Sequence, residues 1–102
     1  DAFEDNLIFR WDSQIGKGNS SPYMQKVCTA PRKHLLVKKS DAETSFYYMG
    51  QFDIVESIDG QKEDNNGKLQ PIAKVKMKMH QPVREDLLRY LQSNISKENK
   101  AV

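Results

Sequence analysis

The chain has 102 residues, which is enough for one modest hydrophobic core but not for two. Its 16 Lys and Arg residues against 14 Asp and Glu residues leave a formal net charge of +2, so overall charge is excluded as an argument for nucleic-acid binding. The single cysteine, Cys28, excludes an intramolecular disulfide and a CxxC motif. No apolar run approaches the roughly 18 residues that span a bilayer. These features predict a cytoplasmic domain with no membrane partner.

Residues 1–5 resemble a linker met in mid-sequence, which predicts that the chain is a fragment of a larger protein. In residues 6–14, Leu7, Phe9 and Trp11 alternate with Ile8, Arg10 and Asp12, and this period of two predicts a first strand. Residues 15–22 are rich in Gly, Asn and Ser and predict a surface loop. A short second strand is predicted at residues 34–39, while residues 23–33 stay unassigned.

The longest strand signal covers residues 46–58, where Gly50 predicts a bulge or a bend. Residues 59–70 contain two Asx-Gly pairs and predict a long polar hairpin connection, after which residues 71–80 form a cleanly alternating strand. An amphipathic helix is predicted after Pro82 from the spacing of Val83, Leu87, Leu88, Leu91 and Ile95. Residues 97–102 are expected to form a disordered tail.

Four or five strands followed by one helix predict a mainly β, α+β domain over residues 6–96. The expected architecture is a small, curved antiparallel sheet or barrel capped by the C-terminal helix. The predicted core consists of Val75, Met77, Leu35 or Leu36, Phe52, Ile54, Leu87 and Leu91.

No group of residues matches a catalytic site. His34 and His80 lie in separate predicted strands without a metal-ligand spacing or a triad motif, and most acids lie where they solvate loops or cap the helix. The Gly16-Lys17-Gly18 tripeptide is not a phosphate-binding loop. The chain is therefore expected to be no enzyme, with no cofactor, no metal and no small-molecule substrate.

The strand at residues 71–80 carries a row of cations on one face. Lys74, Lys76, Lys78 and His80 alternate with Ala73, Val75, Met77 and Met79, and same-face neighbours in a strand are about 6.5–7 Å apart. That spacing suits consecutive backbone phosphates. The other candidates for nucleic-acid contact are Arg10, Lys38 and Lys39, of which the two lysines would extend the row if their strand lies nearby. The alternative is an ordinary solvent-facing strand or a guarded sheet edge.

Four aromatic residues are candidates for stacking on a base: Trp11, Tyr23, Tyr47 and Tyr48. Trp11 stands beside the polar Asp12, Ser13 and Gln14, and an exposed indole there would stack on and read a base. Alternatively, Trp11 shares a face with Phe9 and belongs to the core. The tyrosines, likewise, would either form an aromatic pocket or anchor the barrel by packing alone.

The order of these segments resembles a known family. The segments are FRWDSQ at 9–14, a Gly/Ser loop with Tyr23, HLLVKK at 34–39, FYYMGQF at 46–52, and a strand leading into QPV at 81–83 and the pair Leu87-Leu88. Together they resemble the domain of unknown function at the C-terminus of bacterial superfamily 2 DEAD/DEAH-type helicases. The resemblance covers residues 6–92, and its most specific parts are W-x-S-Q and Y-x-G-x-F.

The resemblance implies an accessory domain of a restriction or defence protein in which a phospholipase D-like nuclease domain often precedes the helicase motor. The family is similar in layout to PUA-like and SRA-like readers of modified bases, an analogy of fold only. This chain departs from the family where Lys38-Lys39 replaces an Arg-containing strand end, and in its long 59–70 segment.

Two functions follow as hypotheses. The first is a non-catalytic domain that binds DNA, with modified bases as one target, for helicase and nuclease domains of the same chain. The alternative is a protein-interaction or structural module that packs against the motor through the helix at 83–95 or the aromatic strand at 46–58.

Overall fold

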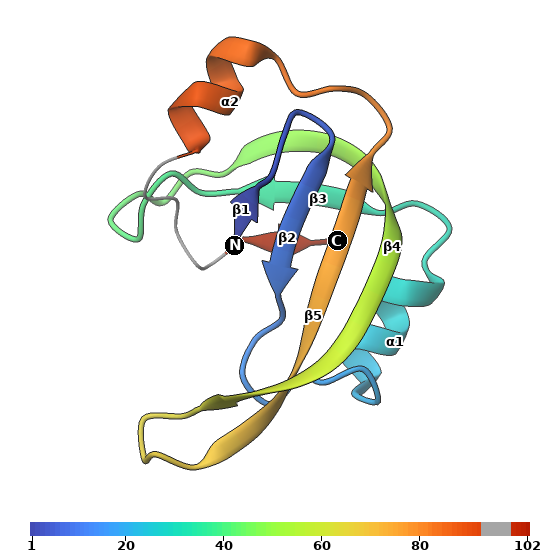
Figure 1. Cartoon of the computed structure of the whole chain (residues 1–102), viewed down its shortest axis with the longest axis vertical. Helices are drawn as coiled ribbons and strands as arrows, with labels where there is room; N and C mark the ends of the chain where they lie inside the picture. The colour runs from blue at the N-terminus through green and yellow to red at the C-terminus, as the bar shows by residue number, and fades with distance from the viewer. Residues whose placement is uncertain (93–98) are drawn as a thin grey trace.

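The computed structural model describes residues 1–92 and 99–102. In that part of the chain the elements are β1 (Ala2–Phe3), β2 (Ile8–Asp12), α1 (Pro22–Thr29), β3 (His34–Val37), β4 (Tyr47–Glu63), β5 (Leu69–Met79), α2 (Glu85–Leu91) and β6 (Lys100–Ala101). The strands form one antiparallel sheet in the order β1-β2-β5-β4-β3-β6 (Figure 1). The prediction of a mainly β domain with a curved antiparallel sheet is confirmed.

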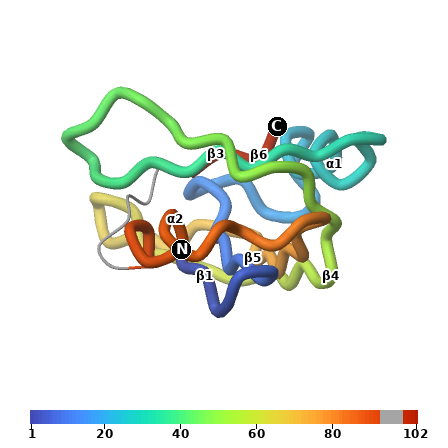
Figure 2. Tube along the Cα trace, turned by 90° about the horizontal axis from the view of Figure 1, so that it is seen from above, coloured from blue at the N-terminus to red at the C-terminus, as the bar shows by residue number. Residues whose placement is uncertain are grey.

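The sheet curls into a half-barrel because β4 belongs to both of its halves. The first residues of β4 pair with β3 and the rest pair with β5, so the strand passes from one layer to the other (Figure 2). The pairing register shifts at Met49, next to Gly50, which has a φ of 107°. A second shift occurs at Val55. Bulges increase local twist and bend, so the irregularity predicted at Gly50 is confirmed and helps to curl the sheet.

Alternating side chains of the strands fill the interior of the half-barrel. Phe9 pairs with Met77 across the β2–β5 ladder, and Trp11 pairs with Val75, so all four side chains enter one core. The fully buried residues there also include Met24, Leu35, Val37, Phe52 and Leu91. The core prediction is confirmed for Val75, Met77, Leu35, Phe52 and Leu91, while Ile54 and Leu87 are only partly buried against it.

Helix α1 occupies the stretch that the sequence left unassigned, so the expectation of one helix was incomplete. Ser21 caps its N-terminus by accepting a hydrogen bond from the Met24 amide at 3.2 Å, and Pro22 takes the first helical position. Met24 and Val27, three residues apart, are buried. Neither helix of the described residues is long and apolar enough to cross a membrane.

Both ends of the chain are strands, where a linker and a disordered tail were expected. At the N-terminus β1 pairs with β2, and the ring of Phe3 lies 4.6 Å from that of Phe9. At the other end β6 pairs with β3 and buries Ala101. The tail prediction is therefore wrong for residues 99–102, and residues 97 and 98 lie outside the described residues. Each end is ordered because it offers the core an apolar side chain and adds to a sheet edge.

The long polar connection predicted at residues 59–70 is mostly strand. The β4–β5 ladder continues to the pair of Glu63 with Leu69, and only a tight turn around Asp64 remains. Hydrogen bonds from the Gln70 side chain and from the Lys68 and Asn66 amides close this turn and lower the pKa of Asp64. The prediction failed because this part of the hairpin extends beyond the core and carries polar side chains.

Helix α2 begins at Glu85, two residues after the predicted stripe begins at Val83. Val83 is nevertheless buried, and Leu87, Leu88 and Leu91 pack against the core as the spacing predicted. The last residue of the stripe, Ile95, lies outside the described residues.

Candidate functional site

The lysine row lies on the outer face of β5. Lys74, Lys76 and Lys78 point away from the core that Val75 and Met77 enter, and Arg10 stands beside Lys76 on the neighbouring strand. Trp11, by contrast, faces the interior. The structure therefore separates the two halves of the site that the sequence suggested.

Acidic side chains interrupt the positive charge of this outer face. Arg10 forms an ion pair with Glu4 at 2.5 Å and approaches Glu56 at 4.0 Å. His80 lies 3.1 Å from Asp53. The outer face is a surface of mixed charge, which weakens its attraction for a polyanion.

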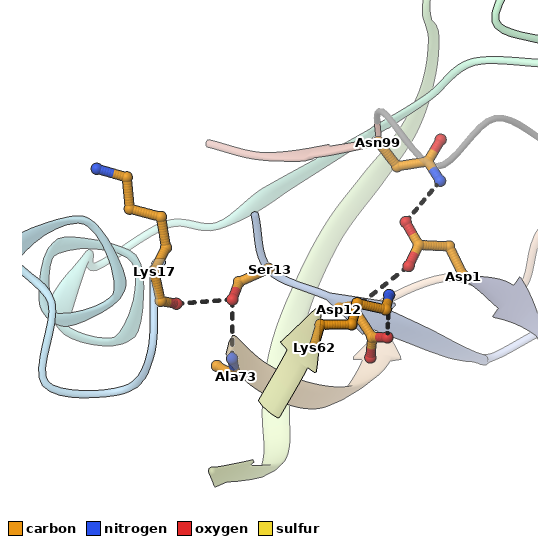
Figure 3. A network of polar contacts seen from close by, with 7 residues as sticks. All are labelled: Asp1, Asp12, Ser13, Lys17, Lys62, Ala73 and Asn99. Carbon is orange, nitrogen blue, oxygen red and sulfur yellow. Dashed lines mark hydrogen bonds and ion pairs between the residues drawn. The ribbon is translucent and has the colours of Figure 1, made fainter. Parts of the chain in front are cut away.

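Trp11 is a core residue, as the alternative interpretation held, and is not an exposed stacking platform. It is 3% exposed, and its indole Nε1 donates a hydrogen bond to the carbonyl of Asn99 at 3.1 Å. The Asn99 side chain accepts a hydrogen bond from the Lys38 amide at 3.0 Å. It donates one to the carboxylate of Asp1 at 2.9 Å (Figure 3). Asn99 thus ties the N-terminus, β2 and β3 together across the open side of the half-barrel.

Tyr47 and Tyr48 point in different directions, and neither lines the cavity that Trp11 faces. The Tyr48 hydroxyl lies 2.8 Å from Nδ1 of His34 on the outside of β3 and β4. Tyr47 meets Tyr90 of α2 edge to face, and its hydrogen bond raises the pKa of Tyr90. Lys39 covers the Tyr90 ring at 4.7 Å, so this lysine serves the α2 contact and not the lysine row.

A cavity of about 540 Å³ opens at the mouth of the half-barrel, between the end of β2, α1, the end of β3 and β6. We call it the mouth pocket. It is lined by Trp11, Asp12, Ser13, Gln14, Tyr23, Lys38, Phe46, Asn99, Lys100 and Val102. Three of the residues predicted for nucleic-acid contact, Trp11, Tyr23 and Lys38, thus come together from separate segments. Lys38 is buried here and does not extend the lysine row.

Ser13 forms the rigid wall of the mouth pocket. Its hydroxyl donates to the Lys17 carbonyl at 2.6 Å and accepts from the Ala73 amide at 2.8 Å (Figure 3). The side chain is buried, so both of these bonds are made without water. The hydroxyl therefore fixes the chain that follows β2.

We expect Ser13→Ala to lower the free energy of unfolding by about 1–3 kcal/mol, because the buried Ala73 amide loses its acceptor. Urea denaturation followed by circular dichroism measures the change. The matched control is Ser20→Ala at an exposed position, where we expect a change of less than about 0.5 kcal/mol. Equal losses for the two variants would contradict the role given to Ser13.

Gln14 differs from the other residues of the W-x-S-Q segment. Trp11 and Ser13 are explained by packing and by buried hydrogen bonds, but the Gln14 side chain is exposed and has no hydrogen-bond partner among the described residues. It lines the mouth pocket with an amide that offers two donors and one acceptor. The segment thus places, at the edge of the cavity, an amide that has no hydrogen-bond partner among the described residues.

Aromatic and cationic side chains form the rest of the mouth pocket. The hydroxyl of Tyr23 donates to the Ala101 carbonyl at 3.3 Å, and burial raises the pKa of Tyr23, so the hydroxyl stays a neutral donor near pH 7. The ring of Phe46 is partly exposed, with the ammonium groups of Lys38 and Lys100 at 5.6 and 4.7 Å from its centre. Such walls suit a flat ligand that carries hydrogen-bonding groups and negative charge.

Within residues 1–92 and 99–102, no cluster of three or more His, Cys, Asp or Glu side chains is placed to hold a metal ion.

A family model described as a domain of unknown function, DUF3427, matches residues 1–91 of the chain. The chain belongs to this family. No curated protein and no solved structure matches the chain. The match confirms that the resemblance seen in the sequence was to a domain of unknown function.

The matched region of the DUF3427 domain contains most of the mouth pocket, including the segments that carry Trp11, Tyr23, Lys38 and Phe46. One wall, Asn99 to Val102, lies beyond it. Sequence reasoning missed Asn99 and Lys100 because polar residues after the last helix carried no strand pattern. Phe46 and Gln14 lie in segments that the sequence pattern singled out, but their spacing did not indicate that both line one cavity.

Proposed function

We propose that this DUF3427 domain binds nucleic acid without catalysing a reaction, and that its mouth pocket receives an unpaired base of DNA. The observation that carries the proposal is the meeting of Trp11, Gln14, Tyr23, Lys38 and Phe46 in one cavity. Its volume of about 540 Å³ lies within the range of small-molecule and cofactor sites.

The side chains of the mouth pocket match what recognition of an unpaired base requires. A base taken out of its stack is held by contact with aromatic rings and is read by hydrogen bonds to its edge. Phe46 and Tyr23 supply rings that are only partly buried. Gln14 supplies the amide, and because its side chain has no hydrogen-bond partner among the described residues, binding a base breaks no hydrogen bond there.

The parent protein that we propose follows from the resemblance to domains at the C-terminus of helicases. A helicase separates strands and so exposes unpaired bases, which a non-catalytic domain in the same chain would hold or inspect, modified bases included. The proposed partners are therefore DNA and the helicase and nuclease domains of a cytoplasmic parent protein.

The lysine row has at most a supporting role in this proposal. Lys74, Lys76 and Lys78 have no carboxylate within ion-pair distance among the described residues, so they remain available to phosphates. None of the three lines the mouth pocket. Contacts by the lysine row would position a strand and respond to salt, while the choice of base would come from the mouth pocket.

The test is fluorescence anisotropy with a labelled single-stranded oligonucleotide at several salt concentrations. We expect Gln14→Ala to weaken binding about tenfold, which corresponds to about 1.4 kcal/mol, without changing stability. Its control is Gln25→Ala, an exposed glutamine on α1 that does not line the mouth pocket and should bind as wild type does. Replacing all three lysines of the row by Ala should make the salt dependence shallower by at most about 2 in slope.

Equal affinities for wild type and Gln14→Ala would contradict the proposed role of the mouth pocket. No binding of any oligonucleotide, together with a stable complex between this domain and a helicase motor domain, would favour the alternative of a protein-docking module.

A further inference from the structure

We propose that an open edge of β4 binds an extended, basic segment of a partner protein, which adds to the sheet as a further strand. This free edge consists of Asp59, Gln61 and Glu63, near the turn of the β4–β5 hairpin. None of the three lines the mouth pocket, so the inference does not rest on the nucleic-acid binding proposed above.

Beyond Gln51, β4 has a neighbouring strand on one side only. β3 pairs with β4 up to Gln51, and β5 pairs with it from Phe52 to Glu63. Among the described residues, no other strand pairs with β4. The hairpin therefore extends away from the rest of the sheet, at the bottom of Figure 1, with the other side of β4 open.

The backbone of β5 shows which residues of β4 face the open side. Asp59 lies opposite Ala73, and Gln61 lies opposite Pro71. Pro71 has no amide proton, and its carbonyl, like both backbone groups of Ala73, bonds to residues 13–16 instead. Opposite residues in an antiparallel ladder alternate between pairs that exchange both hydrogen bonds and pairs that exchange none. Asp59 and Gln61 therefore direct their N–H and C=O groups at the free edge.

Hydrogen bonds at both ends of this stretch agree with the alternation. The Asp64 amide donates to the Lys68 carbonyl at 2.9 Å across the turn, so the preceding residue, Glu63, faces outward. The Ser57 carbonyl also faces outward and accepts from the side-chain amide of Asn19 at 3.2 Å. Asn19 thus supplies a partner at Ser57, and the free edge begins after it.

The backbone of the free edge offers unpaired donors and acceptors. Among the described residues, no hydrogen bond reaches the outward groups of Asp59, Gln61 or Glu63, and all three residues are exposed. An extended peptide pairs with such a row when it adds to a sheet. A cavity of about 470 Å³ beside the edge gives room for a side chain of the added strand; it is lined by Gly18, Ser20, Asp59, Gly60, Gln61 and Pro71.

Charge determines which strand fits. β4 carries four carboxylates and one ammonium group, and that ammonium, on Lys62, is paired with Asp12 at 3.0 Å. Within the described part of the chain, the carboxylates of Asp59 and Glu63 have no ion-pair partner. Both project from the same face of the strand, about 13 Å apart along it. Basic side chains four positions apart on an added strand would therefore meet both.

The same charges argue against a second copy of this chain as the occupant. If β4 paired with itself around Gln61, Asp59 of each copy would lie opposite Glu63 of the other, and like charges directly opposite destabilise a ladder. Nucleic acid is repelled by the same carboxylates. The occupant is therefore a basic strand of a different protein.

The test is fluorescence anisotropy with the labelled peptide TKVTVKVT at low salt. Run antiparallel to β4, its two lysines face Asp59 and Glu63, and its central threonine pairs with Gln61. We expect TKVPVKVT to bind at least about tenfold more weakly, because proline removes the N–H that pairs with Gln61. TEVTVEVT should also bind at least about tenfold more weakly, because its glutamates meet carboxylates.

Two variants of the domain separate backbone pairing from charge. Gln61→Pro removes an outward N–H and keeps the bonds to β5, and should weaken binding of TKVTVKVT at least about tenfold. Asp59→Asn combined with Glu63→Gln should weaken it about fivefold at low salt and less at high salt. The matched control is Glu85→Gln with Asp86→Asn on α2, at the other end of the domain (Figure 1), which should bind as wild type does.

Amide hydrogen exchange tests the geometry of the complex. Bound peptide should slow exchange at the odd-numbered residues 59–63, while the even-numbered residues between them are already bonded to β5. Slowing at these odd-numbered positions would support strand addition.

Several results would overturn the proposal: no binding of TKVTVKVT, equal binding of TKVPVKVT, or unchanged exchange at the odd-numbered residues. Self-association of the domain that Gln61→Pro abolishes would identify a second copy as the occupant instead. If circular dichroism shows that Gln61→Pro is unfolded, the peptide comparison and the charge variant still decide. We expect every folded variant to bind the oligonucleotide as wild type does, so failure here leaves the mouth pocket proposal standing.

Discussion

Replacing Phe52 by Ala is expected to lower the free energy of unfolding by about 3–5 kcal/mol. Phe52 is 1% exposed and lies where β4 leaves β3 and begins to pair with β5. Its ring is part of the buried core there, so its removal leaves a cavity where the two layers meet, and close-packed neighbours fill such a space only in part. Chemical denaturation followed by circular dichroism measures the loss.

The control for Phe52 is Ile58→Ala on the same strand. Ile58 is 52% exposed, so we expect its truncation to change stability by less than about 0.5 kcal/mol. A loss at Phe52 no larger than that at Ile58 would show that the register of β4 against β5 is wrong.

Trp11→Ala is expected to have an effect of similar size, about 3–5 kcal/mol. The indole packs among Phe9, Val75 and their neighbours in the core, and its Nε1 also holds the carbonyl of Asn99. Losing it therefore removes core volume and releases a contact across the open side of the half-barrel. Denaturation is followed by circular dichroism, because Trp11 is the single tryptophan and fluorescence would lose its probe.

Trp11→Phe separates these two contributions. It keeps most of the ring but removes the donor, so we expect a loss of about 1–3 kcal/mol, less than that of Trp11→Ala. If Trp11→Phe were as stable as wild type, the bond to Asn99 would contribute nothing, and the half-barrel would not depend on this contact.

The main strands could be predicted from the sequence because each carries a one-sided apolar pattern. Phe9 and Trp11, or Val75 and Met77, identify a buried face by their spacing alone. Helix α1 was missed although its start signal, Ser21-Pro22, is present, because that pair was assigned to the preceding loop. A short helix that buries only Met24 and Val27 offers too little periodicity to correct such an assignment.

The terminal strands could not be predicted, because their order depends on the rest of the fold. β1 and β6 are two residues long, and each is held by pairing with a neighbouring strand and by one buried side chain. The polar end of β4, residues 59–63, was predicted as a loop because its side chains show no buried face. Its backbone is paired throughout, but the side chains beyond Ile58 face solvent on both sides.

The candidate site could be predicted only in pieces. Trp11, Tyr23 and Lys38 were each singled out by residue type, but the lysine row that seemed their natural companion lies on the other face of the sheet. Which cations accompany the aromatic residues depends on how the sheet curls and on β6, which supplies Lys100. Neither is visible in the local pattern of residues.

The central claim is that the mouth pocket, and not the outer face of β5, receives the nucleic acid. The most direct test is a titration of the isotope-labelled domain with a single-stranded oligonucleotide, in which chemical-shift changes of the backbone amides are mapped onto the structure. We predict the largest changes at Gln14, Tyr23, Phe46 and Lys100, with small changes at Lys74 and Lys78. Changes confined to the outer face of β5, or no changes at all, would contradict this account.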